Sequence, residues 1–112
     1  MKAGILTKQG DTFKSWKTRL FLCEGHFLYY FVSEQDEAPR GVISLVGCVV
    51  KVEPEVGAAK KSNCFSLRAK RSYNAHSKKQ FADRLYYFLA DSYSDMSDWM
   101  SILVKCSNWY PE

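Results

Sequence analysis

The sequence has no apolar run near the roughly 18 to 20 residues that a membrane-spanning helix needs. Its first residues, MKAGILTKQG, turn polar too early to form the apolar segment of a signal peptide. We therefore expect a soluble intracellular protein that does not span a membrane.

Metal-binding and catalytic motifs are also lacking. None of the four cysteines, Cys23, Cys48, Cys64 and Cys106, belongs to a C-x-x-C motif or has a histidine at metal-ligand spacing. We expect buried, reduced thiols, with no disulfide framework, zinc site or cofactor. No nucleophile, paired acid/base carboxylates or glycine-rich phosphate-cleaving loop is evident, so we expect a non-catalytic domain.

The composition is that of one small globular domain covering residues 1–112. A chain of 112 residues buries too little surface for two cores, and 46% hydrophobic residues exclude a disordered chain. The net charge of +4 is unevenly distributed, because basic residues cluster in residues 2–19 and again in 68–84. Such an uneven charge distribution favours one face that binds an anion. The alternative interpretation is that the two clusters are solvated basic loops without a ligand.

Short runs with alternating polarity, separated by turn residues, predict strands through most of the chain. The expected strands are residues 3–9, 16–23, 26–32, 41–44, 48–52, 64–68 and 84–90. Between the last two we expect a long basic loop over residues 69–83.

The last segment changes to helical spacing. Apolar residues recur every three or four positions from Met96 to Cys106, which predicts an amphipathic helix over about residues 94–106. Ser92 and Asp95 resemble an N-terminal capping box. Many short antiparallel strands must form a sandwich or a closing barrel, and one amphipathic helix can cover an open end.

Side chains in a strand alternate between two faces, so parity assigns their direction. Lys17 and Arg19 share a face with apolar residues of their strand, and Lys8 and Tyr30 do the same in the flanking strands. We expect these four side chains to converge at one polar mouth of the fold. Because no acid in register neutralises them, an external polyanion is the predicted partner. The alternative is that the basic side chains extend individually into water.

The stretch GILTKQGDTFKSWKTRLFLCEGHFLYYF, residues 4–31, resembles the opening of a pleckstrin homology (PH) domain. The order of the strands, the final helix and its Trp99 extend the resemblance over essentially the whole chain. The resemblance implies a mainly β fold, namely a seven-stranded, bent antiparallel barrel or sandwich capped by one C-terminal helix.

Family members that bind 3-phosphorylated phosphoinositides share an ordered set of basic residues followed by Tyr or Asn. This sequence supplies the set in order, as Lys8, Lys17, Arg19 and Tyr30. Its opening is particularly similar to the cytohesins and protein kinase B, and the cytohesin match adds Lys14 and Arg40. The resemblance implies that Lys8 and Arg19 hold the 3-phosphate and Lys14 the 5-phosphate. It assigns Tyr30 and Arg40 to the 1- and 4-phosphates.

Three further residues are candidates with an open alternative. Phe13, at the tip of the first loop, either inserts into the membrane interface or packs within the loop. Asn74 and His76 either contribute to the pocket or belong to a solvated basic loop, because the segment RAKRSYNAHSKKQFADR does not match the cytohesins clearly.

The function expected from these features is a membrane-targeting module that binds phosphoinositides or soluble inositol phosphates. The first candidate lipid is PI(3,4,5)P3 and the second is PI(3,4)P2, and discrimination among the 3,4,5-, 3,4- and 4,5-phosphorylated lipids stays open. A protein-interaction module with weak, nonspecific binding of anionic lipids is the alternative. Nucleic-acid binding is disfavoured, because the aromatic residues mostly follow the parity of the core.

We expect a cytoplasmic, monomeric domain that is recruited peripherally to the inner face of the plasma membrane or to endomembranes. The resemblance suggests a signalling kinase or an exchange factor as the parent protein, whose other domains are potential partners.

Overall fold

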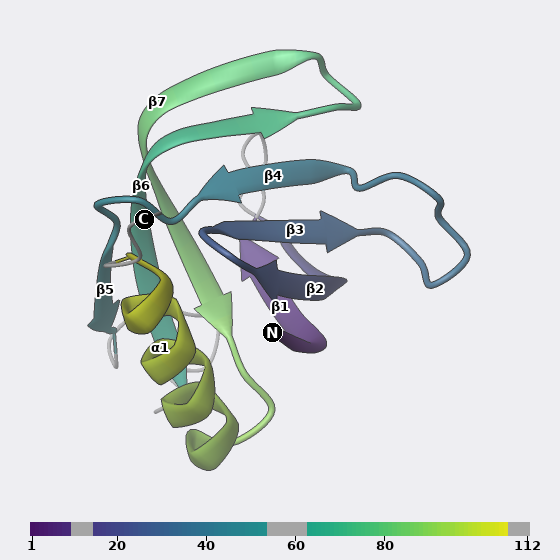
Figure 1. Ribbon diagram of the computed structural model, residues 1–112. Helices are drawn as coiled ribbons and strands as arrows, with labels where there is room; N and C mark the ends of the chain where they lie inside the picture. Colours follow the sequence, from purple (N-terminus) through teal and green to yellow (C-terminus); the bar gives the residue numbers. More distant parts are fainter. Residues whose placement is uncertain (10–14, 54–62, 108–112) are drawn as a thin grey trace.

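The computed structural model describes residues 1–9, 15–53 and 63–107, which form a β-barrel followed by one helix (Figure 1). The strands are β1 (Lys2–Gln9), β2 (Trp16–Glu24), β3 (Phe27–Phe31), β4 (Gly41–Ser44), β5 (Val49–Val52), β6 (Cys64–Asn74) and β7 (Lys79–Leu89). The helix is α1 (Tyr93–Ser107).

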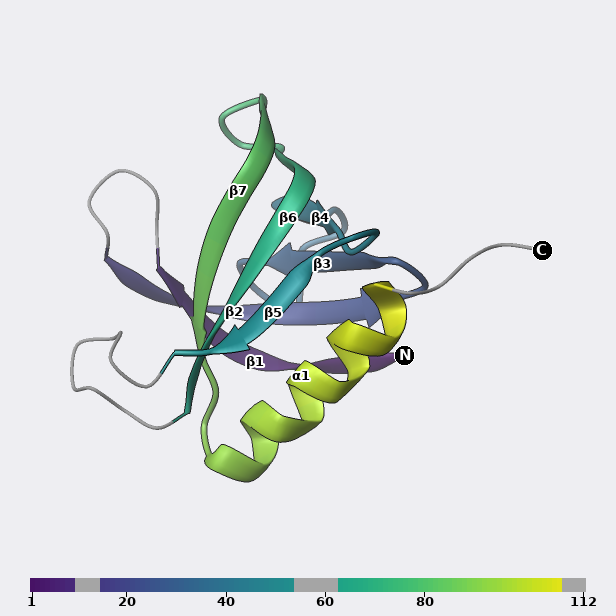
Figure 2. The same ribbon diagram turned by 90° about the vertical axis from the view of Figure 1, so that its left-hand side faces the viewer.

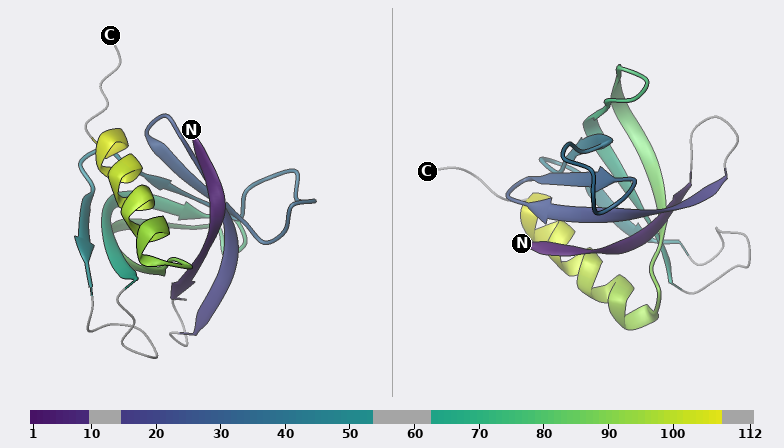
Figure 3. Two further views of the ribbon diagram at one scale, coloured as in Figure 1. Left: turned by 90° about the horizontal axis from the view of Figure 1, so that it is seen from below. Right: turned by 90° about the vertical axis from the view of Figure 1, so that its right-hand side faces the viewer.

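The strands form one antiparallel sheet that closes on itself. Its order is β4-β3-β2-β1-β7-β6-β5, and a further pairing between β4 and β6 closes a ring of six strands, with β5 attached outside β6. This arrangement confirms the mainly β, barrel-like fold predicted from the sequence. Figures 2 and 3 show α1 lying across one opening of the barrel, with β1 on one side and β5 and β6 on the other.

The helix packs by the face that its spacing predicted. Met96, Trp99 and Leu103 are buried, and Trp99 is fully enclosed. Gly4 of β1 permits this close packing, because a Cβ at that position would lie 3.3 Å from Cζ2 of Trp99. The predicted N-terminal cap is present, since the Asp95 amide donates a hydrogen bond to Ser92 Oγ at 3.0 Å.

The prediction of a long loop over residues 69–83 is wrong. Strand β6 continues to Asn74 and β7 begins at Lys79, and the two strands pair along this whole length. The Asn74 side chain stabilises the turn between them, because its Oδ1 accepts a hydrogen bond from the Ser77 amide at 2.9 Å. The sequence did not indicate strands here because most side chains at this end of the hairpin are exposed and polar.

The core is built from aromatic rings contributed by opposite parts of the barrel. Phe88 lies between Phe21 and Phe65, with ring centroids 5.4 Å and 5.3 Å away. All four cysteines are free thiols. Cys23 and Cys64 are buried, as predicted, whereas Cys48 and Cys106 are only half-buried. No helix within the described residues has the length and apolar character to cross a membrane.

Candidate functional site

Neighbouring strands align three of the predicted basic residues with Tyr30. Lys8 of β1 lies directly opposite Lys17 of β2, and Arg19 is two residues further along β2. Tyr30 of β3 is the register partner of Phe21 in β2. Like charges placed directly opposite each other destabilise an antiparallel pair, so the two facing lysines are unfavourable for the fold alone.

Lys8 is the buried member of this group. Its side chain is only 8% exposed, and its Nζ lies 5.0 Å from the centroid of the Tyr30 ring. Burial is the main reason that the pKa of Lys8 falls from 10.5 to about 8. Nearby positive charges lower this pKa further, in the order Arg84, Arg19, Lys17 and Arg40. A buried ammonium group is therefore surrounded by four other cations.

Tyr30 connects the end of β3 to the turn between β6 and β7. Its hydroxyl accepts a hydrogen bond from Asn74 Nδ2 at 3.2 Å. The Arg40 amide donates to the Tyr30 carbonyl at 2.8 Å, and the Arg40 carbonyl accepts from the Ala75 amide at 2.7 Å. A Cβ at Gly41 would overlap the Tyr30 ring, so glycine is required for this arrangement. The backbone of Arg40 is thus held from both sides.

Arg84 of β7 was not among the residues predicted from the sequence. Its guanidinium carbon lies 4.2 Å from the ring centroid of Phe81 and 4.6 Å from that of Tyr86. The positive φ of 52° at Asp83 interrupts the regular alternation between Phe81 and Arg84. Strand parity could have found it, because Arg84 lies on the same face of β7 as the buried residues Tyr86 and Phe88.

We call the five cationic residues around this strand end the basic mouth: Lys8, Lys17, Arg19, Arg40 and Arg84. The ion pairs formed wholly within the described residues join Lys2 to Asp95 at 3.9 Å and Arg68 to Asp83 at 3.5 Å. Neither pair includes Lys8, Lys17, Arg19 or Arg40. A dense positive field of this kind attracts a multivalent anion.

The other predicted site residues differ in their placement. Asn74 reaches the mouth through its bond to Tyr30, whereas His76 is exposed in the turn beyond it. Phe13 and Lys14 belong to residues 10–14, outside the described part of the chain. Their predicted roles stay predictions.

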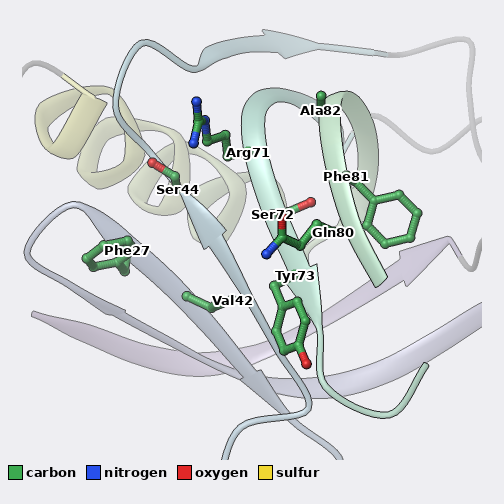
Figure 4. A pocket seen from close by; sticks show the side chains of 9 residues that line it. All are labelled: Phe27, Val42, Ser44, Arg71, Ser72, Tyr73, Gln80, Phe81 and Ala82. Carbon is green, nitrogen blue, oxygen red and sulfur yellow. The ribbon is translucent and has the colours of Figure 1, made fainter. Parts of the chain in front are cut away.

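A separate groove of about 600 Å³ lies where β3 and β4 face the hairpin of β6 and β7 (Figure 4). Phe27, Val42 and Tyr73 are among the residues that line it, and Val42 and Tyr73 are register partners. Arg71 is the one charged residue in its lining. The groove is therefore more apolar than the basic mouth and shares none of its cations.

Comparison with known proteins identifies the fold and its relatives. A family model described as "PH domain" matches residues 1–108. The ankyrin repeat, PH and SEC7 domain containing protein secG of Dictyostelium discoideum is 32% identical over 106 residues, 88% of this chain and 10% of that protein. Human Rho GTPase-activating protein 25 is 30% identical over 106 residues, 92% of this chain and 15% of that protein. The chain thus spans only a small part of these relatives.

Solved structures agree with this assignment. The crystal structure of the C-terminal PH domain of pleckstrin superposes with a TM-score of 0.72 at 29% identity, covering 96% of this chain and 97% of that one. The same pleckstrin domain has been solved in complex with D-myo-Ins(1,2,3,5,6)P5, and that structure has a TM-score of 0.72 at 28% identity over 96% of this chain and 95% of that one.

Proposed function

The chain belongs to the PH domain family, and on this premise we propose that it is a non-catalytic module that binds phosphoinositide headgroups. The observation that carries the proposal is Lys8, a buried lysine surrounded by four other cations. Such a cluster is costly unless an anion completes it. The inositol pentakisphosphate bound to the related pleckstrin domain supports an inositol phosphate as that anion.

The chemistry of the basic mouth suits clustered phosphates. An arginine guanidinium can bind two phosphate oxygens at once, whereas a lysine ammonium acts as a compact point charge. Hydrogen bonds to charged groups contribute about 1.5–3 kcal/mol each. Lys8 would hold the innermost phosphate, with Arg19 and Arg84 beside it. Arg40 would reach the rim of the headgroup, since its backbone is fixed next to Tyr30.

The proposal extends to the preferred lipid, to two contacts of the first loop and to membrane recruitment. PI(3,4,5)P3 would be the preferred lipid and PI(3,4)P2 the second candidate, because the order of Lys8, Lys17, Arg19 and Tyr30 resembles that of family members that bind 3-phosphorylated lipids. Lys14 would contact the 5-phosphate and Phe13 would enter the membrane interface. Recruitment to the cytoplasmic face of a membrane, as a monomeric domain of a longer signalling protein, completes the proposal.

Vesicle binding tests the proposal directly. Vesicles would contain each phosphoinositide in turn. Control vesicles would have the same total negative charge, supplied by phosphatidylserine instead. We expect binding that depends on the headgroup and weakens at least about tenfold in Lys17→Ala and Arg19→Ala, as loss of one charged hydrogen bond predicts. Lys51→Ala, an exposed lysine on β5, is the matched control and should bind like the wild type.

Thermal unfolding of each variant separates loss of binding from loss of folding. Binding that follows only the total negative charge would contradict headgroup recognition. Failure to bind any lipid would contradict the proposal as a whole and favour a protein-interaction module instead.

A further inference from the structure

The burial of Lys8 affects its protonation, and its protonation affects how a ligand binds at the basic mouth. The residue is 8% exposed, and its ammonium lies against the face of the Tyr30 ring. Desolvation disfavours the charged form of a buried lysine, and neighbouring cations disfavour it further. A bound polyanion offsets the neighbouring positive charges and so favours the charged form of Lys8.

Within residues 1–9, 15–53 and 63–107, the charged groups that act on Lys8 come from several elements of the barrel. Strand β2 contributes Lys17 and Arg19, the end of the β3–β4 connection contributes Arg40, and β7 contributes Arg84. All four are positive. The two phenols nearby do not change charge near neutral pH, because burial raises the pKa of both Tyr30 and Tyr86.

We propose that binding of a polyphosphate headgroup at the basic mouth is coupled to uptake of a proton by Lys8. This inference rests on the proposed function and deepens it, because it names how the same site is regulated. The unliganded domain exists as a mixture of charged and neutral Lys8, and the ligand selects the charged form. The site is therefore a sensor of pH as well as of phosphate.

The size of the effect follows from proton linkage. With a Lys8 pKa of about 8, roughly half of the unliganded molecules carry a neutral Lys8 at pH 8, so about half a proton enters with each ligand. Between pH 7 and pH 9 the coupling lowers affinity about tenfold.

The ligand's own ionisation changes affinity in the opposite direction. Phosphomonoesters lose their second proton near pH 6, so their charge is nearly complete above pH 7. Binding to permanently charged cations would therefore stay constant or strengthen slightly from pH 7 to pH 9. A marked weakening over this interval is the signature of Lys8.

Isothermal titration calorimetry at pH 8 with soluble inositol 1,3,4,5-tetrakisphosphate tests the inference. Titrations in two buffers with different ionisation enthalpies report the number of protons taken up. For the wild type we expect about half a proton per ligand. Lys8→Arg keeps its charge throughout this pH range and should abolish the uptake. Lys51→Arg is the matched control, because Lys51 is an exposed lysine of β5 outside the basic mouth, and its uptake should equal that of the wild type.

The outcomes separate this inference from the proposed function. Binding of the tetrakisphosphate without proton uptake, or with equal uptake in Lys8→Arg, would overturn the coupling alone. The absence of any binding at pH 7 would overturn the coupling and the proposed function together.

A second measurement does not depend on a folded variant. In wild-type protein with 13C-labelled lysine, the Lys8 Cε resonance should titrate with a midpoint near pH 8, following its pKa of about 8. Saturating tetrakisphosphate should raise this midpoint by at least about one pH unit, as a nearby opposite charge does. An unliganded midpoint near that of a free lysine, or no shift on saturation, would overturn the coupling.

Discussion

The Nζ atom of Lys8 lies 5.0 Å from the centroid of the Tyr30 ring, and both side chains are almost completely buried. The ring face stabilises the cation only partly, because a cation–π contact contributes about 0.5–2 kcal/mol. The remaining cost of burying this charge among four other cations is unexplained by the needs of the fold. An anionic ligand explains it.

Replacing Lys8 by methionine should stabilise the unliganded domain. The lowered pKa of about 8 implies that holding Lys8 charged costs the native state up to about 3 kcal/mol. Urea unfolding of Lys8→Met at pH 7 should show a gain in the free energy of unfolding of that order, together with loss of headgroup binding. A less stable Lys8→Met at pH 7 would contradict this account.

The difference in the free energy of unfolding between Lys8→Met and the wild type should depend on pH. The native state releases the Lys8 proton near pH 8, whereas the unfolded chain keeps it to near pH 10.5. Between these values the unfolded state binds more protons, so the Lys8 contribution to wild-type stability rises with pH. The advantage of Lys8→Met should therefore be full below pH 8 and shrink towards pH 10, as measured by unfolding at several pH values. A constant advantage would contradict the assignment.

Gly41→Ala should disturb the site through Tyr30. The new Cβ would overlap the Tyr30 ring, and overpacking of this kind costs about 1–3 kcal/mol. Tyr30→Leu removes the overlap, so the double variant should lose less stability than the sum of the two single variants. Chemical denaturation of all three variants checks this expectation. Strict additivity would show that the two residues do not conflict.

Arg84 and Arg68 form a matched pair for testing the basic mouth. Both are arginines of the β6–β7 hairpin. Arg84 is half-buried on the face of β7 that carries Tyr86 and Phe88, whereas Arg68 is exposed and lies near Asp83 on the outside of the hairpin. Arg84→Ala should weaken binding of a soluble inositol tetrakisphosphate about tenfold or more. Arg68→Ala should change it by less than about twofold, because surface ion pairs contribute little. Equal effects in a fluorescence competition assay would mean that only net charge matters.

Ser92→Ala tests the helix separately from the site. Loss of an N-cap costs about 1 kcal/mol, whereas Ser97→Ala, at an exposed position within α1, should cost nothing measurable. The helix lies at one side of the barrel and the β3–β4 and β6–β7 connections at the other (Figure 1). Thermal unfolding should therefore distinguish the two variants while headgroup affinity stays unchanged in both.

The sequence predicted the parts of the fold whose residue pattern depends on a single buried face. The helix is the clearest case, because Met96, Trp99 and Leu103 recur at helical spacing and all three are buried. The first hairpin is another, since Lys8 and Arg19 could be assigned to one face by parity. In both elements, local period and tertiary packing agree.

The hairpin of β6 and β7 could not be predicted in the same way. Its outer part, residues 70–83, is mostly polar, and its pairing with β4 depends on contacts far apart in the sequence. The irregularity at Asp83 further disrupts the alternation. Arg84 lay within the predicted strand 84–90 but was missed as a site residue, because the pairing that sets Lys8 of β1 opposite Phe88 of β7 could not be inferred from the sequence.

A two-dimensional NMR titration with soluble inositol 1,3,4,5-tetrakisphosphate tests the central claim most directly. The amides of Lys8, Arg19 and Arg84 should shift most, and saturably, as the ligand is added, and Arg19→Ala should greatly reduce these shifts. Amides of residues that line the separate groove between β3, β4 and the β6–β7 hairpin, such as Phe27 and Ser44, should change little. Shifts concentrated at the groove, with none around Lys8, would contradict the account.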